Sequence, residues 1–118
     1  MSGPNRFPSR ERLTRKRDYE AVFEHGRKRV ARAFICFVVR REGQGRRFGF
    51  AVSRKVGKAV VRNRVKRYLR EIYRANRACL SEDIDLVLVA RPQAAELNYH
   101  QCAAAIRRLL NDGGLLSG

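Results

Sequence analysis

The chain has 118 residues, which is enough for one domain and too few for two. Lys and Arg number 27 against 11 Asp and Glu, so the formal net charge is +16, and 44% of the residues are hydrophobic. The hydrophobic content excludes a wholly disordered basic tail, and the charge predicts a polyanionic partner, either nucleic acid or an anionic membrane surface. No apolar run approaches the ~18 residues that span a bilayer, so we expect no membrane-spanning segment.

Polar residues and two prolines open the chain, and we expect residues 1–12 to form a flexible basic arm. A single domain is expected at residues 13–112, followed by a loose tail at 113–118. The arm has no apolar stretch of the secretory type. The three cysteines are odd in number and widely spaced, which predicts reduced thiols and no zinc site. We therefore expect a cytoplasmic protein.

The first predicted element is a short helix at about residues 15–25, with Leu13 as hydrophobic staple and Thr14 as N-cap. Gly26 is its stop signal. β-branched and aromatic residues then predict a strand over residues 30–41.

A short pairing segment near residues 28–32 is expected to precede this strand, and a glycine-containing turn at 42–45 follows it. Residues 46–54 alternate large and small side chains and predict a second long strand. A basic helix is predicted at about residues 59–76. The continuous Ile, Leu and Val run at 84–90 predicts a buried strand.

Asn98, with Gln101 in capping-box position, predicts the start of a last helix that runs to about Asn111. The order is therefore α-β-β-α-β-α, or α-β-β-β-α-β-α if the short pairing segment is a strand. Either order predicts an α+β sandwich in which helices pack on a sheet.

The basic helix at residues 59–76 is the most informative segment. Its apolar residues fall within about a third of the helix circumference and predict attachment to a core: Val61, Val65, Tyr68, Leu69 and Ile72. The far side carries Asn63, Lys66, Arg67, Arg70 and Arg74, with Arg62 and Arg64 on opposite flanks. Residues 54–77 contain ten Lys or Arg and one acid, Glu71, whereas a solvated face usually mixes signs. We interpret this side as a contact surface for phosphates.

An aromatic stripe lies on the first predicted helix, where Tyr19, Val22 and Phe23 share one face. Phe37 of the first long strand could stand beside them. Spacing alone favours core packing. The alternative is a floor for unstacked bases, surrounded by cations that hold the nucleic-acid backbone: Arg15, Arg17, Arg27, Arg54 and Lys55.

Catalytic constellations are absent from the sequence. Asp83 and Asp85 form a weak metal motif, for which a structural role at a helix terminus or a strand edge is the favoured interpretation. There is no Ser/His/Asp set, no Cys/His dyad and no glycine-rich phosphate loop. The residues therefore predict neither a catalytic group nor a metal site on this chain.

Residues 48–67 read Phe-Gly-Phe-Ala-Val-Ser-Arg-Lys-Val-Gly-Lys-Ala-Val-Val-Arg-Asn-Arg-Val-Lys-Arg and resemble the signature of the bacterial ribonuclease P protein subunit. The resemblance covers about residues 12–110. It implies a two-layer sandwich of the ribosomal protein S5 domain 2-like type, with a four-stranded sheet and a left-handed β-α-β crossover, against the general rule. It also implies that the domain binds a large catalytic RNA, which removes the 5′ leader from precursor tRNA and requires Mg²⁺.

The resemblance further implies two binding surfaces. One faces the catalytic RNA through the Arg-Asn-Arg motif and its neighbours: Arg62, Asn63, Arg64, Lys66, Arg67 and Arg70. The other is a cleft between the first helix and the sheet, which holds the single-stranded leader: Tyr19, Phe23 and Phe37, with Ser53, Arg54 and Lys55 at its edge. This reverses the preference for a core role of the aromatic stripe. Tyr19 stands where many members have Phe, and that change affects only the finer leader preference.

The implied partners are ribonuclease P RNA and precursor tRNA, with no membrane and no small-molecule substrate. A general RNA-binding or ribosomal protein is the alternative, because it would share the basic helix without needing an aromatic cleft. A stand-alone metal nuclease using Asp83 and Asp85 is remote. A membrane-surface role is weaker still, since the apolar stripe of the basic helix is committed to the core.

Overall fold

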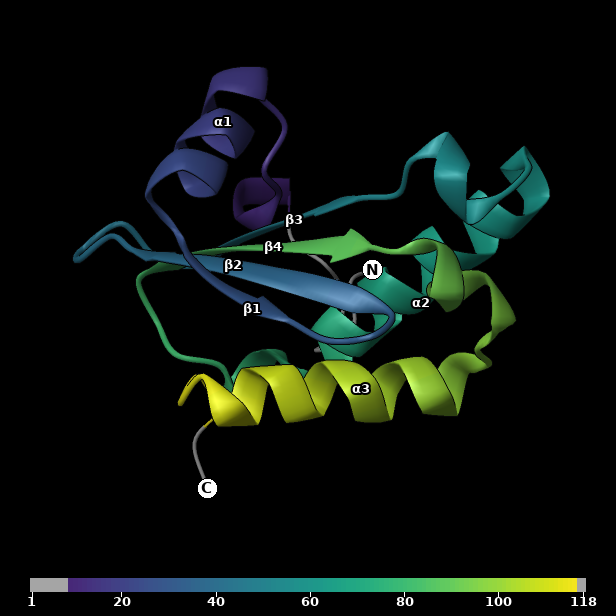
Figure 1. Ribbon diagram of the computed structural model, residues 1–118. Coiled ribbons are helices and arrows are strands. Elements are labelled where there is room, and N and C mark those ends of the chain that lie inside the picture. The colour runs from purple at the N-terminus through teal and green to yellow at the C-terminus, as the bar shows by residue number, and fades with distance from the viewer. Residues whose placement is uncertain (1–8, 117–118) are drawn as a thin grey trace.

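A four-stranded sheet separates one helix from two others in the computed structural model, which describes residues 9–116 (Figure 1). The strands are β1 (Arg27–Val30), β2 (Phe34–Arg40), β3 (Arg47–Ala51) and β4 (Ile84–Ala90). The helices are α1 (Lys16–His25), α2 (Ala59–Asn76) and α3 (Tyr99–Asp112). Short 3₁₀ turns complete the chain: η1 (Ser9–Glu11), η2 (Arg54–Val56), η3 (Arg77–Cys79) and η4 (Pro92–Glu96).

The strand order is β1-β2-β4-β3, with β2 antiparallel to both neighbours and β3 parallel to β4. The parallel pair is joined through α2. In Figure 1 both strands run in the same direction, β3 lies behind β4, and α2 passes beneath the sheet. The crossover is therefore left-handed, and the expected α-β-β-β-α-β-α order of an α+β sandwich is confirmed, with α1 on the face of the sheet opposite α2 and α3.

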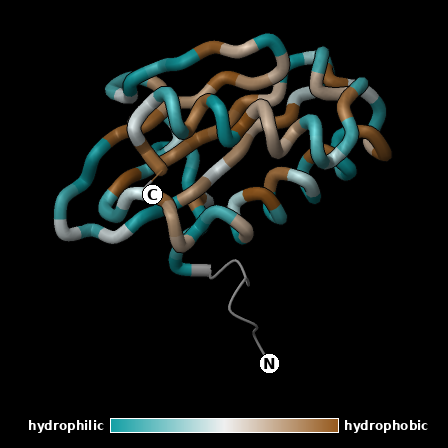
Figure 2. Tube along the Cα trace, turned by 90° about the horizontal axis from the view of Figure 1, so that it is seen from below, coloured by the Kyte–Doolittle hydropathy of each residue, from teal (hydrophilic) through white to brown (hydrophobic). Residues whose placement is uncertain are grey.

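The two faces of the sheet belong to different helices because alternate residues of a strand point to opposite sides. On one face Val22 of α1 and Leu13 pack against Val87 of β4. On the other face the larger core cluster joins the sheet to α2 and α3: Phe34, Phe48, Leu86, Leu88, Val65, Leu69, Ile72, Ile106 and Leu110. Since β4 is covered on both faces, its continuous apolar run is explained. Figure 2 shows hydrophobic and hydrophilic positions alternating along the helical coils, as expected for helices with one buried side.

Several predicted elements are confirmed by the structure. α2 and β4 have the predicted bounds, and Asn98 and Gln101 form the predicted capping box at the start of α3. Their patterns are local, because a helical stripe, a buried apolar run and a cap each lie within one segment. No helix among residues 9–116 is long and apolar enough to cross a membrane.

Three predictions of local structure are wrong in detail. Arg15, not Thr14, is the N-cap of α1, because the chain before it is extended along β3, where the amide of Leu13 donates to the carbonyl of Phe48 at 2.9 Å. The predicted strand at 30–41 is interrupted by a turn closed between Ala31 and Phe34, so that β1 and β2 are separate.

The second long strand ends at Ala51 rather than near residue 54. Ser53 accepts a hydrogen bond from the amide of Lys55 and so caps η2 instead of extending β3.

The expected arm and tail are wrong where the structure describes them. Glu11 is only 6% exposed, and its carboxylate is bound by Arg77 and by the hydroxyl of Tyr73. At the other end Leu115 is buried, and Leu116 forms a β-bridge with Leu80. Glu11, Leu115 and Leu116 are therefore parts of the domain that long-range partners hold in place. The remainder of both segments, 1–8 and 117–118, lies outside the described residues.

Candidate nucleic-acid interface

α2 turns its basic side away from the core. Val65, Leu69 and Ile72 are buried against the sheet, whereas Asn63 and Arg67 are exposed. The helix follows a turn at Gly57. This residue has a φ of 152°, which favours glycine, and a Cβ atom at this position would lie 3.2 Å from the side chain of Val61. The predicted division of α2 into an apolar stripe and a displayed basic side is thus confirmed.

The flanking arginines of the predicted motif also anchor the helix. Arg62 is half-buried and its Nε donates to the carbonyl of Gly57 at 3.1 Å. Arg64 is also half-buried, and its Nη2 donates to the carbonyl of Ala95 in η4 at 2.8 Å. The two side chains therefore tie α2 to Gly57, just before the helix, and to η4. The sequence placed them on opposite flanks but gave no sign of these carbonyl partners.

Two further cations of α2 lie over aromatic rings. The guanidinium carbon of Arg67 is 5.6 Å from the ring centroid of Tyr68, and that of Arg70 is 5.4 Å from the ring of Phe50. Both arginines remain exposed. Cation–π contact restricts these side chains while the charge stays accessible to an anion. Lys66 is half-exposed on the same side of the helix.

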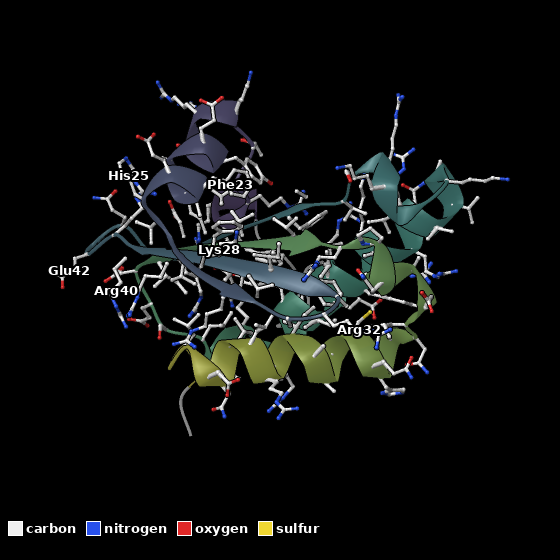
Figure 3. All side chains as sticks on the ribbon, viewed as in Figure 1. Phe23, His25, Lys28, Arg32, Arg40 and Glu42 are labelled. Carbon is white, nitrogen blue, oxygen red and sulfur yellow. The ribbon has the colours of Figure 1, made fainter. Side chains whose placement is uncertain are left out.

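The aromatic residues predicted for the cleft come together on the face of the sheet that α1 covers. We refer to Tyr19, Phe23 and Phe37 as the aromatic cluster. The rings of Phe23 and Phe37 have centroids 5.0 Å apart at 76°, and those of Tyr19 and Phe23 are 6.4 Å apart. Phe23 is 40% exposed, and Figure 3 shows this residue of α1 above the sheet. The cluster therefore offers apolar surface to solvent as well as packing.

Two residues that sequence reasoning missed shape this cluster. Gly49 of β3 leaves the space for Tyr19, because a Cβ at this position would lie 2.5 Å from the tyrosine hydroxyl. That hydroxyl donates to the carbonyl of Leu13 at 3.1 Å, and burial raises the pKa of Tyr19. Lys28 of β1 places its Nζ 5.9 Å from the ring centroid of Phe37. No local pattern could have identified either residue, since both partners are distant in sequence.

The basic residues predicted at the cleft edge lie apart from the aromatic cluster. Ser53, Arg54 and Lys55 are exposed in and before η2. In Figure 1, η2 and α1 stand on the same side of the sheet, toward opposite ends of the strands. The partly exposed side chains of Ile35 and Val89 lie on the sheet face between them, because they follow the same alternation as Phe37 and Val87. An extended single strand of nucleic acid that crosses this face would therefore contact both the aromatic cluster and the basic residues at η2.

The acids considered as metal ligands have structural partners. Asp85 is 3% exposed and accepts hydrogen bonds from Arg41 at 3.2 Å and from Arg47 at 2.8 and 2.9 Å. Asp83 has a φ of 58° and accepts from the amide of Gly45 at 2.8 Å. Among residues 9–116 no group of three His, Cys, Asp or Glu side chains could hold a metal ion. Both aspartates therefore hold neighbouring segments together at the start of β4.

The buried thiols carry no reactive character. Burial raises the pKa of Cys36 to about 12 and that of Cys102 to about 11. Both side chains are enclosed by the core beneath the sheet. At neutral pH they are protonated and behave as small apolar groups.

Comparisons with known proteins agree with this geometry. The family model described as Ribonuclease P matches residues 7–113. The ribonuclease P protein component of Desulfovibrio desulfuricans is 47% identical over 108 residues, which cover 88% of this chain and 83% of the relative. That of Natranaerobius thermophilus is 41% identical over 106 residues, covering 88% and 92%. The solved structure of the ribonuclease P protein from Thermotoga maritima matches with a TM-score of 0.78 at 28% identity, over 92% of this chain and 99% of that one.

Proposed function

This chain belongs to the bacterial ribonuclease P protein family, and from that premise we propose how it acts as the protein subunit of this endoribonuclease in tRNA 5′ processing. The basic side of α2 binds the catalytic RNA, and the aromatic cluster binds the single-stranded 5′ leader of precursor tRNA. The observation that carries the proposal is the exposure of both surfaces on separate elements that pack on one sheet.

Contact with the catalytic RNA rests on charge at fixed positions. Arg62, Asn63, Arg64, Lys66, Arg67 and Arg70 are the residues we assign to it. Because Arg62 and Arg64 are held by backbone carbonyls, their guanidinium groups are positioned before RNA arrives. Less side-chain entropy is lost on binding when the cations are already ordered. The single sign of the surface favours phosphates over a protein partner.

Leader binding rests on stacking and backbone charge. Tyr19, Phe23 and Phe37 form the stacking surface, and Ser53, Arg54 and Lys55 lie further along the same face. Base–aromatic stacking contributes about 1–3 kcal/mol per base and tolerates every base. Leaders differ in sequence, so recognition through stacking and phosphates suits the substrate better than base-edge hydrogen bonds. The protein thereby favours precursor, which carries a leader, over product, which does not.

We assign the chemistry to the RNA subunit, with Mg²⁺ bound there. Asp85, the one buried aspartate among the described residues, is occupied by two guanidinium groups and has no lone pairs left for a metal ion. Mg²⁺ supplies charge stabilisation at the phosphate that reacts. The protein's own contribution is to reduce repulsion between phosphate-rich strands, which lowers the Mg²⁺ concentration that the RNA requires.

A maturation assay tests the proposal. A bacterial ribonuclease P RNA is incubated with precursor tRNA at low Mg²⁺, with and without this protein. We expect the protein alone to be inert and the pair to cleave at the mature 5′ end faster than the RNA alone. If the protein did not stimulate cleavage by the RNA, the chain would be a general RNA-binding protein. If the protein cleaved precursor tRNA alone, the catalytic groups would lie on this chain.

The role of the aromatic cluster has its own variant. Phe23→Ala is expected to reduce the preference for precursor over product roughly tenfold, which is the loss of one stacked base. Val30→Ala is the matched control, because Val30 is also an exposed apolar side chain, at 56%, and lies outside the cluster. If both variants preferred precursor over product to the same extent, the result would argue for a general RNA-binding protein without a leader site.

A further inference from the structure

A cavity of about 310 Å³ lies under the β1 edge of the sheet, on the face opposite the aromatic cluster. The strand register builds it. Arg27 and Arg29 of β1 pair with Val38 and Cys36 of β2, so all four side chains point to the α3 side. Gly113 and Leu115, which follow α3, close the cavity. We call this cavity the edge pocket.

Three arginines and one histidine line the edge pocket without protein partners. Arg27, Arg29, Arg40 and His25 line it, and none of these side chains forms a hydrogen bond or ion pair with any residue in the described range 9–116. No acidic residue lines it. Figure 3 shows His25 and Arg40 at the same end of the sheet, while nearby Glu42 points outward from the β2–β3 turn. Arg27, Arg29 and Arg40 are exposed, so their guanidinium groups are accessible to an anion from outside the chain.

The floor of the edge pocket is apolar. Cys36 and Leu115 are buried and Val38 is half-buried, and all three line the cavity. Arg29 crosses the floor at the end of α3, where a Cβ on Gly113 would lie 3.3 Å from the arginine Nε. A bare inorganic anion would meet the arginines and leave the apolar floor unused. The pocket therefore fits a ligand with an anionic group and an uncharged body that packs on the apolar floor.

We propose that the edge pocket binds a nucleotide unit, with the phosphate on Arg27, Arg29 and Arg40 and the base on the apolar floor. Its volume is at the lower end of the range for small-ligand sites, about 300 Å³. Arg binds phosphate through two parallel N–H donors, which three arginines at one rim can supply. The unit can come from a free mononucleotide or from an unpaired position of an RNA strand.

The edge pocket is separate from both surfaces of the proposed function. β1 is one edge strand of the sheet and β3 is the other, and α2 lies along β3, where Arg70 covers Phe50. The aromatic cluster is on the opposite face. An RNA bound in the pocket would therefore contact the protein at a third place, and failure of the pocket would leave the two other surfaces untouched.

Nuclear magnetic resonance of the full ¹⁵N-labelled chain locates the site directly. Titration with adenosine 5′-monophosphate at low salt is expected to shift the amide signals of β1, of Val38–Arg40 in β2 and of Gly113. Inorganic phosphate and adenosine alone are expected to bind at least tenfold more weakly, since each uses one half of the pocket. Shifts confined to α2 or to the aromatic cluster, or phosphate binding as tight as the mononucleotide, would overturn the proposal.

Variants separate the pocket from the general positive charge of the chain. Arg29→Gln and Arg40→Gln are each expected to weaken mononucleotide binding roughly tenfold, the loss of one charged hydrogen-bonding group. Arg32→Gln is the matched control, because it removes the same charge from an exposed arginine outside the pocket, and less than a twofold change is expected. Equal weakening by all three would mean that only net charge matters and would refute the site.

A short single-stranded RNA without terminal phosphates distinguishes the two sources. If it shifts the same pocket signals and binds more tightly than the mononucleotide, the natural ligand is an unpaired position within RNA. If the mononucleotide binds more tightly, the ligand is a free nucleotide. RNA that shifts no pocket signals, together with no mononucleotide binding, would overturn the proposal while the maturation assay stayed intact.

Discussion

Single side chains on the α1 side of the sheet decide how the strands are held together. Asp85 on β4 binds Arg47 of the neighbouring β3 and Arg41 after β2, and Arg47 also pairs with Asp18 of α1 at 3.4 Å. Arg47 donates hydrogen bonds to the Asp85 carboxylate, and these bonds raise the pKa of Arg47. These four charges connect three strands to the first helix. A buried carboxylate of this kind stabilises only while its partners remain.

Asp85→Asn is expected to lower the free energy of unfolding by about 3–5 kcal/mol, because two guanidinium groups lose their buried counter-charge. Urea denaturation measures the change. Asp112→Asn, at an exposed position, is the control and is expected to change stability by less than about 0.5 kcal/mol. A stable Asp85→Asn protein that lost cleavage in the holoenzyme would instead make Asp85 a catalytic group.

Glu11 gives the stability a defined dependence on pH. Burial acts to raise its pKa, but hydrogen bonds from Arg77 and Tyr73 outweigh burial and lower it below the ordinary value of 4.5. A lowered pKa stabilises the fold fully above the unfolded value, and this contribution is lost as pH falls through the folded value.

Glu11→Gln is therefore expected to be less stable than the parent by about 3 kcal/mol at neutral pH, and the gap is expected to close as pH falls below 4.5. Thermal unfolding across this range measures it. Glu20→Gln is the control, since its pair with Lys16 lies on the surface and is expected to contribute under about 0.5 kcal/mol. A gap that stayed constant down to strongly acid pH would contradict the proposed ion pairs of Glu11.

Gly49 and Tyr19 are expected to be energetically coupled. Gly49→Ala introduces a Cβ that overlaps the Tyr19 ring, at an expected cost of about 1–3 kcal/mol. In a Tyr19→Ala background the same change is expected to cost under about 0.5 kcal/mol, because the overlapping atoms are gone. A double-mutant cycle of unfolding free energies measures the coupling. Additive effects would show that the ring moves aside without cost.

At the scale of elements, α2 is both a binding surface and a structural brace. Its buried side joins the core beneath β3 and β4, and its two flanking arginines reach Gly57 and η4. Stability and RNA affinity therefore overlap at Arg62 and Arg64. They are separate at Lys66, which has no hydrogen-bond or ion-pair partner within the described range.

Arg64→Ala is expected to lose about 1 kcal/mol of unfolding free energy as well as RNA affinity, since the carbonyl of Ala95 loses its donor. Lys66→Ala is expected to lose RNA affinity with stability unchanged. Urea denaturation and RNA binding, measured on both variants, separate the two effects. If both variants were equally stable, the contact between α2 and η4 would make no net contribution.

Across the whole molecule, positive charge is distributed over three separate places on the surface. α2 displays its cations beneath β3, η2 carries Arg54 and Lys55 above it, and β1 carries a third group at the other edge. With a net charge of +16, binding to RNA is dominated by release of counterions from phosphates.

Binding to the catalytic RNA is therefore expected to weaken by about a thousandfold or more between roughly 50 and 200 mM salt. Lys66→Ala should reduce the slope of log K against log salt concentration by about 1, because one phosphate contact is lost. Phe23→Ala, which changes no charge, should leave the slope unchanged. A filter-binding titration that was flat in salt would contradict an electrostatic interface.

Much of this architecture could be predicted because its signals are local. The stripe on α2, the apolar run of β4 and the capping box at Asn98 each occupy one segment, and each is found where predicted. The Arg-Asn-Arg motif and the aromatic stripe were likewise visible as spacings, and the structure brings Tyr19, Phe23 and Phe37 together. The placement of residues 9–12 could not be predicted, because their partners are far along the chain.

Local sequence patterns are enough to predict the types of helix and strand and the side of α2 that carries charge, and the motif at residues 48–67 is enough to identify the family. Periodicity and local composition act over a few residues, so they need no knowledge of the fold. Which distant groups meet follows from the folded arrangement alone: Glu11 with Arg77, Gly49 with Tyr19, and the arginines of β1 with the end of α3. Such contacts depend on strand order and register, which local preferences leave open and which packing of the whole core selects.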